Sequence, residues 1–326
     1  MCWTGPLRAA SLLVLICLST SSFGDTASVR SWLKRMTDAA QNLNYDGTFV
    51  HRSGNQLETM RIIHRADEKG ERSRLVSLSG KKREVLRNST QVVCILPDDQ
   101  SGVVAKTRPP NLFSPNVLTA KEGFEDYYAL TVSGGDRVAG RLTEVLNLSP
   151  KDTHRYGYRL WVDRETGFLL KSELLNPHGL PLEQFIYTHI SLLLPIPDEL
   201  LEPAISGREM TWHISENTPS GNSNVDSDDQ TNWSVAWLPE GFMMTDQAES
   251  SMPSGDRMVK QMVYTDGLAS LSVFIEPLGD HEPLDGLSMM GALNAFGLIV
   301  EQHQITVVGE VPSETVKAVA KSVVRQ

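Results

Sequence analysis

The sequence predicts an α+β protein with two domains: a large, curved antiparallel half-barrel and a smaller domain in which a sheet packs on one helix. Three observations predict this. Residues 25–205 contain about ten short segments of alternating apolar and polar residues, joined by turns rich in Gly, Ser, Asn and Asp. One amphipathic helix precedes these segments, and a stretch of loop-like composition follows them. Because about ten strands are too many for a flat open sheet, we expect the sheet to curl around the helix.

The start of the 326-residue chain has the features of a secretory signal. Arg8 precedes an apolar run from Ala9 to Leu18, and small residues follow up to Gly24. Ten apolar residues are too few for a membrane anchor, so we predict that residues 1–24 form a signal peptide and that the exported chain is soluble. Two of the three cysteines leave with this segment, so Cys94 is expected to be a buried, inert thiol.

The first part of the mature chain is predicted to be a helix followed by a meander of strands. Apolar residues recur at helical spacing from Val29 to Leu43, and the period then changes to two. Short connections between these strands indicate antiparallel pairing. The expected strands are residues 45–52, 56–66, 71–78, 83–87, 91–96 and 102–107.

A proline-rich stretch, residues 108–116, then interrupts the strands, since proline cannot sit in a central strand. It contains Leu112 and Phe113, which either tuck into the core or form a lid over a cavity. A short helix is expected at residues 121–128. The predicted strands then resume at residues 140–148, 156–162, 168–175 and 182–191.

The clearest strand pair is the hairpin at residues 156–175. Its alternation puts an apolar set on one face, and Arg159, Lys171 and Glu173 on a back that we expect to be solvated. We interpret the apolar face either as ordinary core or as the wall of a cavity suited to acyl chains. The candidate wall residues are Tyr158, Leu160, Phe168, Leu170 and Leu174.

A strand and a flexible linker are predicted for residues 206–232, because residues 215–231 are rich in Ser, Asn, Asp and Gly. Residues 233–326 then form the small C-terminal domain. Its expected strands are residues 259–264, 268–276, 295–301 and 305–308, and Ser313 is the expected N-cap of a closing helix. Residues 25–206 are neutral, with 23 cationic and 23 acidic side chains, whereas residues 207–326 hold 6 and 17, a net charge of −11. That excess argues against nucleic acid and suggests either solubility or a basic partner.

The sequence does not contain a recognisable catalytic constellation. Its eight histidines are scattered, none at the spacing of a zinc helix, and no phosphate loop, nucleophile elbow or dinucleotide fingerprint is present. We therefore expect a protein that binds rather than an enzyme, with no cofactor and no metal. One candidate binding patch is Lys81, Lys82 and Arg83 at a turn. It is either a solvated cationic edge or a docking site for an anionic head group or acidic peptide.

Several short motifs resemble one known family, the MucB/RseB proteins, in the order in which that family has them. They are Leu-Asn-Tyr-Asp-Gly-Thr-Phe at 43–49, Gly-Lys-Lys-Arg-Glu-Val at 80–85, Tyr-Arg-Leu-Trp-Val-Asp at 158–163, Leu-Glu-Gln-Phe at 182–185, Trp-Leu-Pro-Glu-Gly-Phe at 237–242, Tyr-Thr-Asp-Gly-Leu at 264–268 and Val-Val-Gly-Glu-Val-Pro at 307–312. The resemblance covers nearly the whole mature chain.

This resemblance implies a periplasmic negative regulator of the sigma-E (AlgU) envelope-stress response. Its first domain would be a half-barrel similar to LolA, LolB and LppX, and its partner the periplasmic domain of a transmembrane anti-sigma factor of the RseA/MucA kind. It would shield that segment from site-1 proteolysis until a lipid, a lipoprotein or lipopolysaccharide releases it. The alternative is a periplasmic lipid or lipoprotein carrier of the LolA kind. The sequence leaves open whether the chain forms a homo-oligomer.

Overall fold

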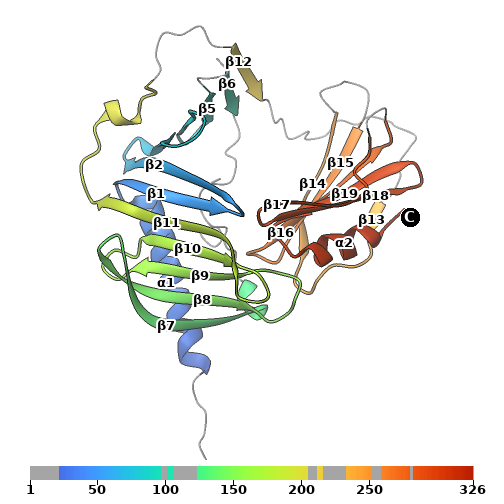
Figure 1. The fold of residues 1–326 in the computed structure, drawn as a ribbon, viewed down its shortest axis with the longest axis horizontal. Coiled ribbons are helices and arrows are strands. Elements are labelled where there is room, and N and C mark those ends of the chain that lie inside the picture. The colour runs from blue at the N-terminus through green and yellow to red at the C-terminus, as the bar shows by residue number, and fades with distance from the viewer. Residues whose placement is uncertain are drawn as a thin grey trace, which may run out of the picture.

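A computed structural model describes residues 22–96, 101–105, 123–204, 211–215, 233–251, 258–279 and 282–325. These residues form two large, separate sheets, each with one α-helix against it, and a further two-stranded sheet (Figure 1). Of the predicted α+β fold, a mostly-β chain with a large sheet and a separate smaller C-terminal sheet is therefore confirmed. The predicted signal peptide up to residue 21, the candidate lid residues Leu112 and Phe113, and the predicted linker residues 216–231 lie outside the described ranges.

The large sheet has twelve strands in the order β12-β6-β5-β4-β3-β2-β1-β11-β10-β9-β8-β7. The strands are β1 (Tyr45–Ser53), β2 (Gln56–Asp67), β3 (Gly70–Ser77), β4 (Glu84–Arg87), β5 (Val92–Leu96), β6 (Ser101–Ala105), β7 (Tyr128–Val138), β8 (Arg141–Pro150), β9 (Gly157–Asp163), β10 (Leu169–Leu175), β11 (Pro181–Leu192) and β12 (Thr211–Ser215). All neighbours pair antiparallel except β12 and β6, which run parallel. The predicted antiparallel pairing is therefore confirmed for the strands within residues 25–205, and the strand predicted after that domain adds to the same sheet as its parallel edge strand β12.

The helix α1 (Ser22–Asn42) runs across the curve of the large sheet (Figure 1). Its buried residues Val29, Leu33 and Met36 belong to one core cluster with side chains of β7 to β10. Near the helix end, Ala39 joins a second cluster formed largely by β1, β2 and β11. The predicted apolar stripe of the helix thus covers the sheet, as such a stripe must because apolar surface is costly to leave in water.

The expected helix at residues 121–128 is wrong beyond one short turn. Of the described residues 123–128, Phe124–Asp126 form a 3-10 helix, η3, and β7 begins at Tyr128. Sequence patterning missed β7 because Ser133, Gly134 and Gly135 read as a turn. In the structure this stretch is a β-bulge, since the register shifts between Val132 and Gly135 while pairing with β8 continues on both sides.

After β11 the chain crosses the sheet on the side opposite α1, where arginines of β2 and β3 hold it. Arg65 donates to the carbonyl of Ile196 and pairs with Asp198 in the 3-10 helix η4 (Asp198–Leu201). Arg74 donates to the carbonyl of Leu200 at 3.3 Å. The segment 196–204 is therefore fixed on the outer surface before the chain reaches β12.

The second sheet has the order β14-β15-β16-β19-β18-β17, and a two-stranded sheet of β13 and β20 lies with it. The elements are β13 (Trp233–Val235), β14 (Met243–Ser251), β15 (Met258–Thr265), β16 (Ser270–Pro277), β17 (Gly286–Met290), β18 (Leu293–Val300), β19 (His303–Gly309), α2 (Ser313–Lys321) and β20 (Val323–Arg325). The side chains of Val316, Val319 and Ala320 on α2 are buried against this sheet. Ser313 is the first helical residue, and Pro312 takes the N-cap position in its place.

Within the described ranges, no helix combines the length and the apolar composition needed to cross a bilayer. Among the same residues, no group of three or more His, Cys, Asp or Glu side chains is placed to hold a metal ion.

Candidate functional site at the junction of the two sheets

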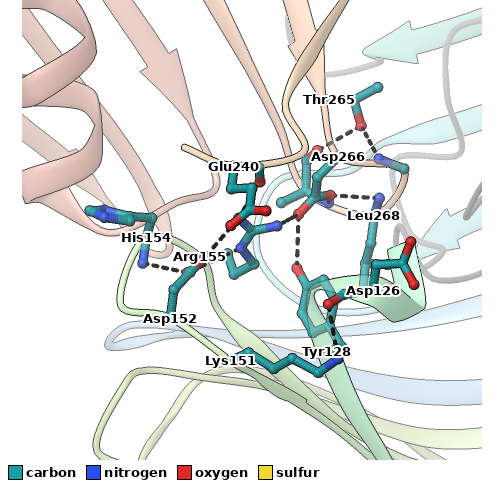
Figure 2. Close-up of polar contacts among 12 residues, drawn as sticks. Asp126, Tyr128, Lys151, Asp152, His154, Arg155, Glu240, Thr265, Asp266 and Leu268 are labelled. Atoms are coloured by element: carbon teal, nitrogen blue, oxygen red, sulfur yellow. Dashed lines mark hydrogen bonds and ion pairs between the residues drawn. The ribbon is translucent and has the colours of Figure 1, made fainter. Parts of the chain in front are cut away.

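The two sheets meet where the β8–β9 connection contacts the turn between β15 and β16 (Figure 2). The connection contributes Arg155, and the turn contributes Asp266. The turn carries Asp266 because backbone donors in a turn need side-chain acceptors. The Oδ1 atom of Asp266 accepts the backbone N–H groups of Leu268 and Ala269 at 2.8 and 2.7 Å. Its other oxygen, Oδ2, is left to face the large domain.

Arg155 is a fully buried cation, with 0% of its surface exposed. Its Nη1 lies 2.5 Å from Asp266 Oδ2, and its Nη2 lies 2.7 Å from both Asp152 Oδ2 and the carbonyl oxygen of Glu240. Nε also donates to Asp152, at 3.1 Å. Burial alone would lower the pKa of Arg155, but the hydrogen bonds that its guanidinium donates to Asp152 and the charge of Asp266 outweigh it and raise the pKa. The guanidinium therefore stays charged and links both domains.

Aromatic rings enclose this ion pair on several sides. The guanidinium carbon of Arg155 lies 5.0 Å from the ring centre of Tyr127 and 5.3 Å from that of Phe242, which belongs to the other domain. The Tyr128 hydroxyl donates to Asp266 at 3.5 Å. Burial first, and then the negative charge of Asp266, raises the pKa of Tyr128 well above its ordinary value. This tyrosine is thus a permanent hydrogen-bond donor to the ion pair.

Close approach of the backbone also shapes the junction at Gly241. Its φ of +85° is unfavourable for other residues, and a Cβ atom at this position would overlap the ring of Tyr127. On the other side of the β8–β9 connection, the Thr315 hydroxyl of α2 donates to the carbonyl of His154 at 3.0 Å. The connection is therefore held between the β15–β16 turn and the start of α2.

A second contact joins the tip of the β17–β18 hairpin to the ends of β1 and β11. Ala292 at this tip is fully buried and belongs to the core cluster of the large domain. Its backbone N–H donates to Glu183 Oε1 at 3.4 Å, and the Ser53 hydroxyl donates to the same atom at 2.8 Å. Asn294 donates to the Tyr156 hydroxyl at 2.9 Å. The small domain thus inserts a side chain into the core of the large one.

Glu183 gives this contact a pH dependence whose sign can be derived. Burial alone would raise the pKa of Glu183, but hydrogen bonds from His51, Ser53 and the Ala292 backbone hold it below the ordinary value of a glutamate. Because the folded pKa is the lower one, the ionised carboxylate stabilises the folded chain above the unfolded pKa of about 4.3. This stabilisation is lost as the pH falls through the folded pKa.

We expect the stability difference between the parent chain and Glu183→Gln to be constant above about pH 5.5 and to shrink between about pH 5.5 and pH 3, as the pH falls through the unfolded pKa toward the lower folded one. Urea unfolding at a series of pH values measures this difference. Glu314→Gln is the matched control, because the Glu314 side chain is 80% exposed and its ion pair with Lys317 lies on the surface. A Glu183→Gln difference that stays constant over this pH range would contradict the assignment.

The structure buries all five candidate cavity-wall residues, but it divides them between two clusters. Tyr158, Leu160 and Leu174 pack with α1, whereas Phe168 and Leu170 pack with aromatic residues of β1 and β11. The division follows a shift of register between Leu169 and Lys171, which inserts one residue into β10. The apolar face of the hairpin at residues 156–175 is therefore covered by α1 and by neighbouring side chains.

The expectation of a solvated back to this hairpin is wrong for Glu173. That carboxylate is buried and lies 2.8 Å from both Lys171 Nζ and Gln184 Nε2. Lys171 in turn lies over the ring of the buried Trp161, 3.8 Å from its centre. The large indole ring of Trp161 gives this face an apolar surface that Lys171 covers, so this face of the hairpin is not wholly solvated.

The candidate cationic patch lies in the connection between β3 and β4. Lys81 and Lys82 are exposed, and Arg83 is half-buried, with its guanidinium 3.2 Å from Glu58. The patch lies on the large domain, next to the strands β3 and β4. Sequence reasoning missed the junction itself, and the only local signal was the Tyr-Thr-Asp-Gly-Leu turn at 264–268.

Comparison with known proteins identifies relatives over nearly the full chain. The MucB/RseB N-terminal domain model matches residues 28–205, and the MucB/RseB C-terminal domain model matches residues 227–324. The chain is similar to the sigma factor AlgU regulatory protein MucB of Pseudomonas aeruginosa, with 34% identity over 97% of this chain and 98% of that protein. It is also similar to the sigma-E factor regulatory protein RseB of Haemophilus influenzae, with 27% identity over 98% of each chain.

A solved structure of the Pseudomonas aeruginosa MucA/MucB complex has a similar fold. The TM-score is 0.71 at 31% sequence identity, covering 92% of this chain and 99% of that one.

Proposed function

The chain belongs to the MucB/RseB family, and from that premise we propose that it is a periplasmic negative regulator of a sigma-E (AlgU) type factor. It binds the periplasmic segment of a membrane anti-sigma factor of the RseA/MucA kind and shields that segment from site-1 proteolysis. A lipid, lipoprotein or lipopolysaccharide signal releases it. The observation that carries the proposal is the match of both domains to the family together with a solved MucA/MucB complex of similar fold.

The junction supplies a physical basis for coupling the signal to release. A fully buried ion pair between Arg155 and Asp266 has full strength only in one arrangement of the two domains. A partner that binds across both domains favours that arrangement. A signal that favours another arrangement weakens the binding of the partner, and the partner weakens the binding of the signal by the same free energy. Regulation in this way needs no catalytic residue.

The proposed lipid signal has a structural requirement in the large domain, which we expect to act as a LolA-like half-barrel. Val29, Leu33 and Met36 of α1 already cover the apolar face of the hairpin, so an acyl chain reaches Tyr158, Leu160 or Leu174 only if the helix moves. Displacement of α1 would expose apolar surface at a free-energy cost of about 25 cal/mol per Å². The acyl chain must cover this surface in place of the helix. The signal would therefore exchange places with the helix.

Protease protection tests the proposal directly. The full chain is mixed with the periplasmic segment of the MucA-like protein from the same genome, and a DegS-type protease is added. We expect the complex to form and the cleavage of the segment to slow at least tenfold, with cleavage restored by lipopolysaccharide or a lipidated peptide. If no complex forms and acyl chains co-purify with the chain instead, the lipid-carrier function replaces this one.

A further inference from the structure

Among the residues that the structure describes, the outermost strand of the small sheet on the β18 side, β17, has one edge without a strand partner. Of the described strands, Gly286–Met290 pairs only with β18, from Gly286↔Gly297 to Met290↔Leu293. The other edge of β17 thus presents backbone N–H and C=O groups of alternate residues. Such an edge is a template for pairing with another chain.

The side chains of β17 make this edge unusually apolar. Leu287, Met289 and Met290 are 47%, 68% and 73% exposed, and the strand contains neither a charged residue nor a proline. Unbranched methionines adapt to different partner surfaces, which suits a binding edge. The strand is five residues long and offers about 17 Å of backbone to a partner.

Two other outer strands of the molecule carry the devices that normally prevent such pairing. β14, at the opposite edge of the same sheet, carries Asp246 and Glu249 and has a register shift between Met244 and Asp246. β7, at the edge of the large sheet, carries Asp136 and Arg137 and has a bulge at Gly135. Charges and bulges at edge strands block the addition of another strand. β17 has neither, although exposed apolar surface of this kind is costly unless something uses it.

This edge is continuous with the junction between the domains. Directly after Met290, Gly291 lies against Ser53 and Glu183 of the large domain, and Ala292 is buried in the core of that domain. A strand added to β17 would therefore end where the two domains touch. Its binding would depend on the arrangement of the domains that the Ala292 contact fixes.

We propose that the β17 edge binds an extended, mainly apolar segment of the anti-sigma factor, which adds to the small sheet as a seventh strand. This inference rests on the function proposed above and names the part of the surface that holds the partner. Backbone hydrogen bonds to β17 provide affinity, and Leu287, Met289 and Met290 select apolar side chains at alternate positions of the segment.

The charge near the strand defines the segment further. Glu282 and Asp285 are exposed immediately before β17, in a part of the chain whose net charge is −11 from residue 207 onward. An apolar segment flanked by a lysine or arginine on the side of Gly286 would complement these carboxylates. Charge complementarity of this kind mainly raises the association rate, and salt weakens it.

Paired substitutions on the two edges of the same sheet test the proposal. The variant Met289→Lys/Met290→Lys places two cations on β17, and the matched control Met243→Lys/Met244→Lys does the same on β14, where those methionines are 71% and 54% exposed. Affinity for the periplasmic segment of the MucA-like protein from the same genome is measured by calorimetry. We expect at least a tenfold loss for the β17 variant and less than a twofold change for the control.

A measurement on the unaltered chain provides a second test that does not depend on the variants. Hydrogen exchange with and without the MucA-like segment should show slower exchange at residues 286–290 and no change at residues 243–249. If the parent chain and both variants bind the segment with equal affinity and β17 is not protected, this inference is overturned while the proposed function stays intact. If the parent chain does not bind the segment, the proposed function fails. Dimers that disappear only in the β17 variant would identify a second copy as the occupant and also overturn the inference.

Discussion

Replacing Arg155 by leucine is expected to lower the free energy of unfolding by about 3–5 kcal/mol, because it leaves Asp266 buried without its cation. The Asp266 side chain is 0% exposed, so water cannot replace the guanidinium. The Glu240 carbonyl and Asp152 lose a donor as well. Urea unfolding followed by tryptophan fluorescence measures the loss. Arg159→Leu is the control, because its ion pair with Glu173 is 3.6 Å long and partly exposed, and we expect a loss of less than about 1 kcal/mol.

A second substitution separates the charge of Asp266 from the geometry of its turn. Asp266→Asn removes the charge and keeps an oxygen for the N–H groups of Leu268 and Ala269. The double variant Arg155→Leu/Asp266→Asn should therefore recover part of the stability lost in Arg155→Leu, as a double-mutant cycle would show. Arg155→Leu should also bind the MucA-like segment less tightly, since it no longer holds one arrangement of the domains. A stable Arg155→Leu variant with unchanged affinity would remove the junction from the mechanism.

Replacing Leu160 by aspartate is expected to prevent folding at neutral pH. Leu160 is fully buried in the cluster that α1 covers, and an isolated carboxylate there costs several kcal/mol. Burial raises the pKa of such a group, so the destabilisation should decrease as the pH falls below its folded pKa. Circular dichroism at several pH values measures the folded fraction. Leu180→Asp, at an exposed position between β10 and β11, is the control and should change the stability by less than about 0.5 kcal/mol.

A milder change tests the proposed role of this face in sensing lipid. Leu160→Ala should fold with a loss of about 2–5 kcal/mol and leave a cavity beneath α1. If lipid displaces the helix, this variant should release the MucA-like segment at a lower concentration of lipopolysaccharide than the parent chain does. Release at an unchanged concentration would place the lipid elsewhere in the molecule.

Most of the fold could be predicted from alternation of apolar and polar residues, and the missed elements are those without it. The predicted strands of the large sheet fall within a few residues of the observed ones wherever one face is buried, as in β1 and β2. The strands β14 and β17 were missed because they are edge strands whose side chains are exposed on both faces, so neither shows a buried period. β7 was missed because its bulge reads as a turn.

The junction could not be predicted for a different reason. Arg155 and Asp266 are 111 residues apart, and each lies in a connection where a polar residue is normally solvated. A buried ion pair between two domains requires knowledge of how the domains pack, which a single sequence does not encode as a local pattern. The predicted cavity wall shows the converse, since the alternation correctly indicated burial but could not decide between ordinary core and the wall of a cavity.

The arginine contacts on the outer face of the large sheet affect the length of the tether between the domains. Because Arg65 and Arg74 hold residues 196–200, and β12 pairs with β6, the connection to β13 starts after Ser215 instead of after Leu192. The tether is then residues 216–232 rather than 193–232. The composition of residues 215–231 predicts a flexible linker, and for a linker of that kind, shortening it from 40 to 17 residues lowers the entropy cost of bringing the domains together by about 0.8 kcal/mol. The effective concentration of one domain near the other rises about fourfold, so these distant arginines favour closure of the junction.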